Sequence, residues 1–383
     1  MTTCKFRIER FGAIILFILS QMGCAANSVP VPKGIVPATL PSPFTLPEQN
    51  EDSNLPDDTQ LDLRDKSSIL DVQRTTSGLV ALTGFSKAGS YSIFLQRGEI
   101  WSMVTPESFA PAAGPDQGAI NCISFLDGNG WAVDYGNRVW LTTNAGLNWN
   151  KIGAAPGNVN YAKCESLQFT SSSEGWLTNL SGLYKTEDGG KTWNKINGIA
   201  QGDGALVRFV DPKIGWAISV DDKNNSTVYA TSNAGVSWAA HKLPRTAVYE
   251  FYPLTSNQGF LSAKRKLLKT FDGGSTLAEV SSLPESFAVQ SVYCFDVNVC
   301  WVAGYYFPSG GSTMPRNGAA ALLRTTDGGR TWFEIPITTS EHFFSKIKFF
   351  DAEQGVLAGQ NLLYETTDGG QSWNAVLRFP SGE

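Results

Sequence analysis

The sequence predicts an all-β fold: a seven-bladed β-propeller of four-stranded antiparallel blades, with one type of turn repeated from blade to blade. An eight-residue pattern recurs at intervals of about 40 residues, and short apolar runs typical of strands precede each copy. The composition agrees, because 38 glycines, 11 tryptophans and only 17% charged residues suit a turn-rich β protein. The net charge of −5 gives no reason to expect a nucleic-acid partner.

The repeated pattern has three full copies and three variants. The full copies, "TEDGGKTW", "TTDGGRTW" and "TTDGGQSW", end at Trp193, Trp332 and Trp373. The variants, "TTNAGLNW", "TSNAGVSW" and "TFDGGSTL", end at Trp149, Trp238 and Leu277. The six end points are 44, 45, 39, 55 and 41 residues apart, and the longest interval contains a segment, 305–319, that is typical of a loop insertion. A period of this size built from short strands indicates a propeller.

Each repeat supplies four short strands. In one unit, "SLQFTSSSEGWLT" gives two strands around a turn, "GLYKT" gives the third, and the fourth begins at the tryptophan of the pattern. Residues 69–104 form a degenerate further unit that ends near Trp101. We therefore expect a propeller over residues 61–383, with seven blades and with six or eight as alternatives.

The eight-residue pattern is explained by a turn between the third and fourth strands. The Asp or Asn at its third position can accept hydrogen bonds from the N–H groups of its own turn, and glycine at the fifth position allows a positive φ. These third-position residues are Asn144, Asp188, Asn233, Asp272, Asp327 and Asp368. Asn replaces Asp in two copies, which favours a structural role over a catalytic one. The tryptophans are expected to pack into the seam beside the neighbouring strands, and Leu277 in place of tryptophan should make its blade the softest.

These motifs resemble Asp-boxes, the repeats of bacterial sialidases. The longer pattern, with Phe-x-Asp, Gly-Trp and then Thr-x-Asp-Gly-Gly-x-Thr-Trp, is similar to the photosystem II stability/assembly factor family over residues 65–380. That resemblance implies a non-catalytic platform that binds a protein or another envelope component. In the family, basic residues face the central channel. Arg208 is the candidate here, with a salt bridge to a neighbouring blade as the alternative. An arginine-rich patch like that of the family is not evident.

A glycoside hydrolase, sialidase-like or xyloglucanase-like, is the alternative function. The Phe/Tyr-Arg-Ile-Pro signature of sialidases is absent, since "FRIER" at 6–10 lacks the proline. Tyr249 and Glu250 are adjacent, so on a strand they point to opposite faces unless a bulge intervenes. A pair of catalytic carboxylates would come from Asp127, Asp134, Asp211, Asp296 and Asp351. All but Asp134 recur at one turn position, which favours a turn role, and Asp134 is expected at a solvated strand end. We expect no catalytic residues.

Four cysteines remain for the folded part of the chain. Cys294 and Cys300 flank a five-residue turn and are predicted to form a disulfide across a hairpin. Cys122 and Cys164 precede corresponding strands of adjacent blades and can pair between them. A metal site is the rival interpretation, but the chain has only two histidines. His241 and His342 are each expected to be a surface or loop histidine, and we expect no metal or other cofactor. The run "KRKLLK" at 264–269 is expected to be a solvated hairpin face.

The N-terminus is typical of an export signal. Basic residues precede the apolar run "FGAIILFIL", so residues 1–26 are predicted to be a signal peptide. "MGC" suggests lipoprotein processing that leaves Cys24 lipidated, with cleavage after Ala26 as the alternative. Residues 27–60, rich in proline, are predicted to be a flexible tether. The expected protein is a bacterial monomer, exported to the periplasm or anchored as a lipoprotein, which meets the membrane only through its lipid.

Overall fold

The computed structural model describes most of residues 67–378. The residues described are 67–75, 78–85, 91–97, 100–103, 120–157, 164–199, 203–221, 223–244, 246–263, 266–307, 319–339, 341–360 and 362–378. The chain divides into two units, Met1–Glu51 and Asp52–Glu383, and every described residue belongs to the second. The predicted signal peptide, Cys24 and the predicted tether lie outside the described residues.

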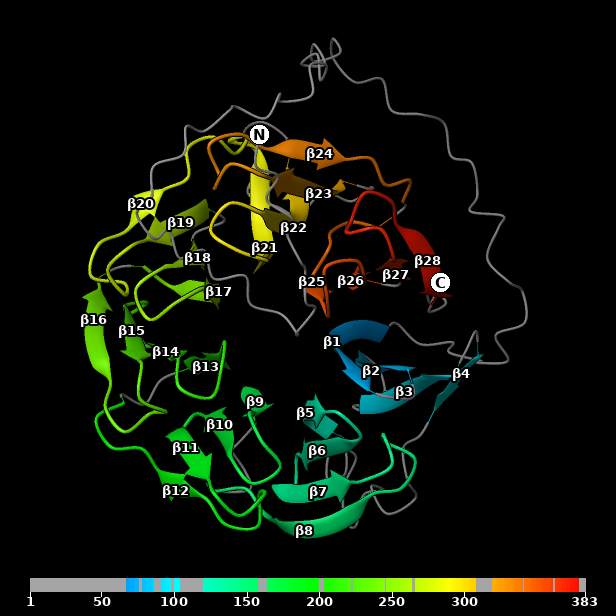
Figure 1. Ribbon diagram of the computed structural model, residues 1–383, viewed down its shortest axis with the longest axis vertical. Helices are drawn as coiled ribbons and strands as arrows, with labels where there is room; N and C mark the ends of the chain where they lie inside the picture. Colours follow the sequence, from blue (N-terminus) through cyan, green and yellow to red (C-terminus); the bar gives the residue numbers. More distant parts are fainter. Residues whose placement is uncertain are drawn as a thin grey trace, which may run out of the picture. The chain divides into compact units, whose positions relative to one another are not determined.

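The described strands form seven four-stranded sheets (Figure 1), all antiparallel, each built from four consecutive strands. The strands of the first three sheets are β1 (Ser67–Thr75), β2 (Gly78–Phe85), β3 (Tyr91–Arg97), β4 (Ile100–Met103); β5 (Ile120–Leu126), β6 (Asn129–Asp134), β7 (Arg138–Thr142), β8 (Asn150–Ala154); and β9 (Ser166–Phe169), β10 (Gly175–Asn179), β11 (Gly182–Thr186), β12 (Asn194–Lys195).

The other four sheets follow the same order. Their strands are β13 (Asp203–Phe209), β14 (Gly215–Val220), β15 (Ser226–Thr231), β16 (Ala239–Leu243); β17 (Val248–Pro253), β18 (Gly259–Ala263), β19 (Lys266–Thr270), β20 (Ala278–Glu279); β21 (Phe287–Cys294), β22 (Cys300–Tyr306), β23 (Ala320–Thr325), β24 (Phe333–Ile335); and β25 (Lys346–Phe349), β26 (Gly355–Ala358), β27 (Leu362–Thr366), β28 (Asn374–Arg378). The predicted all-β propeller with four-stranded antiparallel blades is confirmed.

The prediction of seven blades with Asp-box turns needs a correction. Six sheets, β5–β28, carry the Asp-box turn between their third and fourth strands. In the sheet β1–β4 only residues 98 and 99 separate β3 from β4, which leaves no room for an eight-residue turn. The Asp-box repeat is therefore sixfold, and the first sheet is a different unit. The fourth strand of each Asp-box blade also begins one residue after the end of the pattern, not at its tryptophan.

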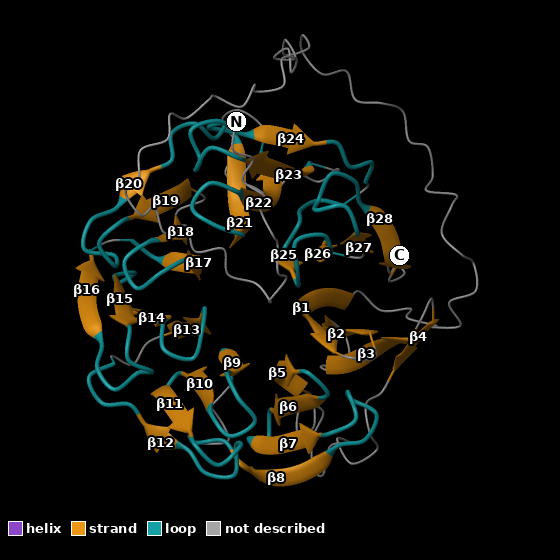
Figure 2. Cartoon of the chain, viewed as in Figure 1, coloured by secondary structure: helices purple, strands orange, loops and turns teal. Residues whose placement is uncertain are grey.

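The first strand of every sheet lies innermost in a ring (Figures 1 and 2). Each inner strand contacts the next, in the order β1, β5, β9, β13, β17, β21 and β25, and β25 contacts β1. Among the described strands, no sheet combines strands from both ends of the chain. The ring is therefore closed by contacts between two complete sheets, β25–β28 and β1–β4, with no shared strand.

Aromatic rings join most of the Asp-box blades. Trp131 of β6 stacks on Phe169 of β9 with ring centroids 3.8 Å apart, and Phe169 meets Trp193 of its own Asp-box edge-on at 6.1 Å. The same three-ring arrangement, called here the aromatic triad, recurs as Trp176, Phe209 and Trp238 and as Trp301, Phe349 and Trp373. The tryptophans of the second strands are fully buried. Burying such a side chain contributes about 3–5 kcal/mol, so the triads are major anchors between blades.

Not every seam contains a triad. Between the sheets β13–β16 and β17–β20, Trp216 is fully buried, but Pro253 stands at the position of the stacked phenylalanine and Leu277 at that of the Asp-box tryptophan. Trp216 packs instead against the backbone of Gly259, where an added Cβ would lie 2.8 Å from its ring. This seam therefore keeps one ring of the triad, Trp216, which packs in an apolar cluster with Phe251 and Leu261 of the next blade.

Both predicted disulfides are present. Cys122 of β5 bonds to Cys164, which lies just before β9, and so links two adjacent blades. Cys294 and Cys300 are paired residues of β21 and β22, so their bond crosses one hairpin. All four cysteines are buried.

Candidate functional site: a charged cluster on the inner strands

The inner strands present a ring of polar side chains at one register. Core residues such as Val72, Val207 and Ile347 are buried, and the side chain that follows each of them points to the other face of its strand. Across the seven strands these residues are Gln73, Ser124, Gln168, Arg208, Tyr252, Tyr293 and Lys348. All but the buried Ser124 are half-buried.

Several of these side chains bind the backbone of the next blade. Gln168 makes two bonds to Phe209: its Nε2 donates to the carbonyl at 2.9 Å, and its Oε1 accepts from the N–H at 2.7 Å. The guanidinium Nη1 of Arg208 donates to the carbonyl of Phe251 at 2.8 Å. Lys348 closes the ring, since its Nζ donates to Gln73 Oε1 at 2.9 Å. The polar ring therefore holds adjacent inner strands in register.

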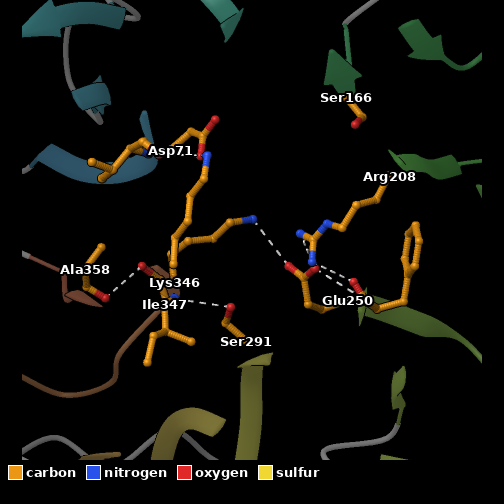
Figure 3. Close-up of polar contacts among 12 residues, drawn as sticks. Asp71, Ser166, Arg208, Glu250, Ser291, Lys346, Ile347 and Ala358 are labelled. Atoms are coloured by element: carbon orange, nitrogen blue, oxygen red, sulfur yellow. Dashed lines mark hydrogen bonds and ion pairs between the residues drawn. The ribbon is translucent and has the colours of Figure 1, made fainter. Parts of the chain in front are cut away.

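Arg208 belongs to a charged cluster that spans the centre of the ring (Figure 3). Its Nη2 lies 2.9 Å from Glu250 Oε1, on the neighbouring strand β17. The second oxygen of Glu250 lies 3.3 Å from Lys346 Nζ, which comes from β25. Arg208 therefore does face the inner ring, and it also makes the salt bridge to the next blade that the sequence offered as an alternative.

Electrostatics keep Glu250 ionised. Burial raises its pKa, but the charges of Lys346 and Arg208 outweigh this effect, so the pKa of the carboxyl lies below its usual value. Its side chain is only 11% exposed, whereas those of Arg208 and Lys346 are 28% exposed. The carboxylate is thus covered by the two cations, which keep part of their surface accessible.

A second carboxylate and a third cation complete the cluster. Burial lowers the pKa of Lys348, and the nearby charges of Lys346 and Arg208 lower it further. The charge of Asp71 acts in the opposite direction and raises it. Asp71 Oδ2 accepts a 2.6 Å hydrogen bond from Gln73, which is also the partner of Lys348. We call Asp71, Arg208, Glu250, Lys346 and Lys348 the inner cluster. Because it holds three cations and two carboxylates, it has the chemistry to bind an anionic group.

Two tyrosines border the inner cluster. The rings of Tyr252 and Tyr293 lie 5.0 Å apart, and the guanidinium of Arg208 lies 5.2 Å from the ring centroid of Tyr252. Burial raises the pKa of both hydroxyls, so they stay protonated at physiological pH. They therefore offer neutral hydrogen-bonding groups beside the three cations.

The Asp-box residues lie in separate turns at the edge of the blades. In one turn, Asp188 Oδ1 accepts from the Thr192 N–H at 2.9 Å and its Oδ2 from the Thr192 hydroxyl at 2.6 Å. Asp272, Asp327 and Asp368 make the equivalent bonds, and Asn144 and Asn233 accept the same backbone bond. The hydroxyl bonds lower the pKa of Asp188 and of Asp368 to about 2. Each of the six residues serves its own turn, and the fold does not bring them together.

The Asp-box tryptophans bond back to their own turns. Trp149, Trp193 and Trp238 donate from Nε1 to the carbonyl of the glycine three residues earlier. Trp149 is buried, whereas Trp193, Trp238, Trp332 and Trp373 are half-buried. The more deeply buried tryptophans are those of the second strands, a role that the sequence analysis did not assign.

The carboxylates considered for a glycosidase occupy structural positions. Asp211, Asp296 and Asp351 accept backbone N–H groups of their own turns, and Asp127 occupies the corresponding turn with a φ of 54°. Asp134 is not at a solvated strand end, as expected from the sequence, but is fully buried. It accepts hydrogen bonds from Arg138 Nε at 2.6 Å and Trp140 Nε1 at 2.9 Å, which explains its burial.

The remaining candidates do not form a site together. Tyr249 is exposed and Glu250 is buried, although the register of β17 shifts between Val248 and Glu250, where a bulge was considered. His241 and His342 are half-buried. Among the described residues no three His, Cys, Asp or Glu side chains are grouped to hold a metal ion. The same residues contain no helix with the length and apolar character needed to cross a bilayer.

Sequence reasoning missed four members of the inner cluster. Only Arg208 was named as a channel residue, and Glu250 was considered only as a partner of Tyr249. Lys346 and Lys348 of "KIKF" stand at the same two registers as Glu250 and Arg208 in their own strands. Each inner strand has a buried core residue, such as Val207 or Ile347, and aligning the seven strands on it would have placed these polar side chains at one register.

Comparisons with known proteins find two groups of similar proteins. A comparison with protein-family models finds no match. The photosystem II assembly lipoprotein Ycf48 of Synechococcus sp. (strain CC9902) is 26% identical over 263 residues, which cover 66% of this chain and 73% of that protein. A solved structure of YCF48 with a bound D1 peptide has a TM-score of 0.56 and 19% identity, and the match covers 80% of this chain and 93% of that one.

A second group of similar structures consists of enzymes. The GH74 xyloglucanase from Xanthomonas campestris has a TM-score of 0.61 at 13% identity, covering 82% of this chain and 55% of the enzyme. At this identity the likeness shows the propeller fold alone.

Proposed function

We propose that this chain, which is similar in sequence and fold to the photosystem II assembly proteins named Ycf48, is a non-catalytic, assembly-factor-like propeller that binds protein. The observation that carries the proposal is the match in sequence to the Ycf48 protein over 263 residues. The bound D1 peptide in the solved YCF48 structure supports a protein as the partner class.

The inner cluster is the binding site that we propose. Arg208 and Lys346 reach the centre of the ring from different blades and remain partly accessible. Glu250 holds both in place, so they are positioned before a ligand arrives. An anionic group of a protein partner, such as a side-chain or terminal carboxylate, is the ligand that suits them.

We further propose that the protein is exported and tethered to a membrane. Lipidation at Cys24, followed by the flexible segment 27–60, would hold the monomeric propeller near its partners. The name of the Synechococcus relative, a lipoprotein, supports this proposal. Mass spectrometry of the protein purified from membranes tests it: a diacylglyceryl group on Cys24 is expected, and a mature N-terminus at residue 27 contradicts it.

A glycoside hydrolase is the second candidate, favoured by the likeness to the xyloglucanase structure and by a xyloglucanase of Paenibacillus sp. that is 20% identical over 264 residues. The structure argues against it, because the carboxylates considered for catalysis accept backbone hydrogen bonds within their own turns or, in the case of Asp134, are buried and hydrogen-bonded to side chains. A panel of fluorogenic glycosides separates the two functions. We expect no turnover, and hydrolysis above the background of a mock preparation would favour the enzyme.

Capture of partners from membrane extracts tests the binding proposal. The tagged full chain is compared with Lys346→Gln and Arg208→Gln variants, whose folding is checked by circular dichroism. Lys223→Gln is the matched control, because Lys223 is exposed and outside the inner cluster. We expect one set of proteins to be captured by the native chain and the control and lost in the two variants. Equal capture by all four chains would contradict the proposed site.

A further inference from the structure

Lys348 stands in the inner cluster without a carboxylate in contact. Its Nζ donates to Gln73 Oε1 at 2.9 Å and to the backbone carbonyl of Val72 at 3.3 Å, and both acceptors are neutral. Among the residues that the structure describes, no carboxylate forms an ion pair with this nitrogen. Arg208 and Lys346, by contrast, each make an ion pair with Glu250. Lys348 therefore differs chemically from the other two cations of the cluster.

The carboxylate of Asp71 is bound within its own strand. Its Oδ1 accepts a hydrogen bond from the backbone N–H of Val72 at 2.9 Å, and its Oδ2 accepts one from Gln73 Nε2 at 2.6 Å. The same Gln73 accepts from Lys348 through its amide oxygen, so it links the two charged groups. An ammonium group on Lys348 thus has two neutral hydrogen bonds and acts on Asp71 only through the charge.

The surroundings of Lys348 disfavour the ammonium form. Lys346 precedes it by two residues on β25, so the two side chains leave the same face of the strand. Burial and the charges of Lys346 and Arg208 lower the pKa of Lys348, although the charge of Asp71 opposes them. A larger share of this side chain than of an ordinary surface lysine is therefore a neutral amine. A neutral amine is a nucleophile, whereas an ammonium group is not.

The charges beside the amine favour one class of electrophile. An aldehyde would give an imine, and its protonated form would keep a positive charge beside Lys346 and Arg208. An acyl group would give a neutral amide, which gains no ionic interaction with these cations. Carbon dioxide gives a carbamate, which is an anion. The two cations that disfavour the ammonium form of Lys348 would stabilise this product, and both are partly accessible.

We propose that Lys348 is a site of reversible carbamate formation with carbon dioxide. The lone pair of the neutral Nζ attacks the carbon atom and forms an N–C bond. One C–O π bond of carbon dioxide breaks, its electron pair goes to that oxygen, and the nitrogen loses a proton to water. The nitrogen keeps one N–H, which can still donate to Gln73 Oε1. The modification goes beyond the proposed function, because it needs no partner protein.

Carbamate formation would reverse the charge balance of the inner cluster. With Lys348 as an ammonium group, the cluster has three cations and two carboxylates. With Lys348 as a carbamate, it has two cations and three anions. Binding of an anionic group of a partner should therefore weaken as the concentration of carbon dioxide rises. This consequence rests on the proposed function, whereas the modification itself does not.

Chemical trapping on the full native chain tests the modification. The protein is equilibrated with isotope-labelled bicarbonate, carbamates are converted to stable esters with an alkylating reagent, and peptide mass spectrometry locates the label. We expect the labelled ester on Lys348 and not on the exposed Lys223. NMR of the same sample should show a carbamate resonance that is lost in Lys348→Arg and kept in Lys223→Gln. Absence of the ester from Lys348 would overturn the proposal, and this result does not depend on the folding of a variant.

A variant pair tests the role of the neighbouring charges. Lys346→Gln removes one counter-charge of the carbamate and should reduce the ester on Lys348. Arg74→Gln is the matched control, because Arg74 joins the same two sheets through Asp351 but lies outside the inner cluster. Equal reduction in both variants, or in neither, would contradict the proposed selection by charge. A carbamate on Lys348 in a chain that captures no partner would support this inference and contradict the proposed function, and capture without a carbamate would do the reverse.

Discussion

The seams on the two sides of the sheet β13–β16 are built differently. Toward β9–β12, Trp176 stacks on Phe209, which meets Trp238, so the seam contains three aromatic rings in contact. Toward β17–β20, proline and leucine replace two of these rings. The second seam is instead spanned by Arg208, which binds both the carboxylate of Glu250 and the carbonyl of Phe251.

The difference shows that one repeat can join its neighbours by either of two interactions. The aromatic triad stabilises by burying apolar area, which is insensitive to salt and pH. The seam between β13–β16 and β17–β20, called here the ionic seam, depends on charges that are partly exposed. Lys346 connects it to a third blade. Part of the inner cluster thus lies at a seam that has no aromatic triad. The following predictions test this comparison, from the largest expected effect to the smallest.

Removing a triad should have the largest effect. Trp301→Ala deletes a fully buried ring that lies 4.4 Å from Phe349, and we expect a loss of about 3–5 kcal/mol in the free energy of unfolding. Urea denaturation measures the loss. A change below about 1 kcal/mol would mean that the triad is not a major anchor.

Neutralising the ionic seam should cost less. Glu250→Gln leaves Arg208 and Lys346 without their shared counter-charge, and we expect a loss of about 2 kcal/mol, since the two cations are partly solvated. The same denaturation experiment measures it. Because salt screens the remaining repulsion, the loss should shrink at high ionic strength, whereas the loss in Trp301→Ala should not. The same salt response in both variants would remove the proposed distinction.

Acid should weaken the ionic seam while leaving the triads intact. The folded-state pKa of Glu250 is depressed, so its stabilising contribution is present above the unfolded value near 4.3 and is lost as the pH falls through the folded value. The pKa values of Asp188 and Asp368 are also depressed, to about 2, so protonation of these Asp-box residues extends the loss of stability toward pH 2. Denaturation between pH 7 and pH 2.5 should show stability falling below about pH 4.5. The fall should begin at lower pH in Glu250→Gln, and an unchanged profile would exclude Glu250 as its source.

Within one Asp-box, the tryptophan ring should contribute more to stability than the charge of the aspartate. Trp332 is half-buried, so Trp332→Ala should lower the free energy of unfolding by about 2 kcal/mol. Asp327→Asn keeps an acceptor oxygen, as Asn144 and Asn233 show in their own turns, and should cost less than about 1 kcal/mol. Melting temperatures rank the two variants. Equal or reversed shifts would contradict the ranking.

Restoring a ring to the ionic seam should give the smallest effect. Leu277→Trp places an aromatic ring at the position that Trp238 occupies in the preceding blade, and we expect a gain of about 0.5–1 kcal/mol. Thermal denaturation measures the gain. A loss of stability would indicate that the surroundings of Leu277 have adapted to the smaller side chain.

The sequence predicted what is encoded locally. Thr186, Asp188 and Gly190 interact within five residues, so their spacing identified the turn and the repeat located the strands. Asp134 was wrongly predicted to be solvated, although its partners Arg138 and Trp140 are also local, because an aspartate at the end of an apolar strand more often faces solvent. The short β3–β4 connection shows that a blade can form without the motif that marks the others.

Contacts between blades could not be predicted in the same way. Arg208 lies 42 residues from Glu250, and Glu250 lies 96 residues from Lys346. Their meeting depends on how the inner strands are aligned around the ring, which no local pattern fixes. The stacking of Trp131 on Phe169 depends on the same alignment.

Native-state hydrogen exchange of the full chain tests the comparison of the two seams most directly. The amides of β9 and β25 border aromatic triads, whereas Phe251 of β17 borders the ionic seam. We predict faster exchange in β17 than in β9 and β25, and a further increase in β17 alone in Glu250→Gln. Equal protection of the three inner strands, or a uniform response to Glu250→Gln, would contradict the claim that charges replace aromatic packing at this seam.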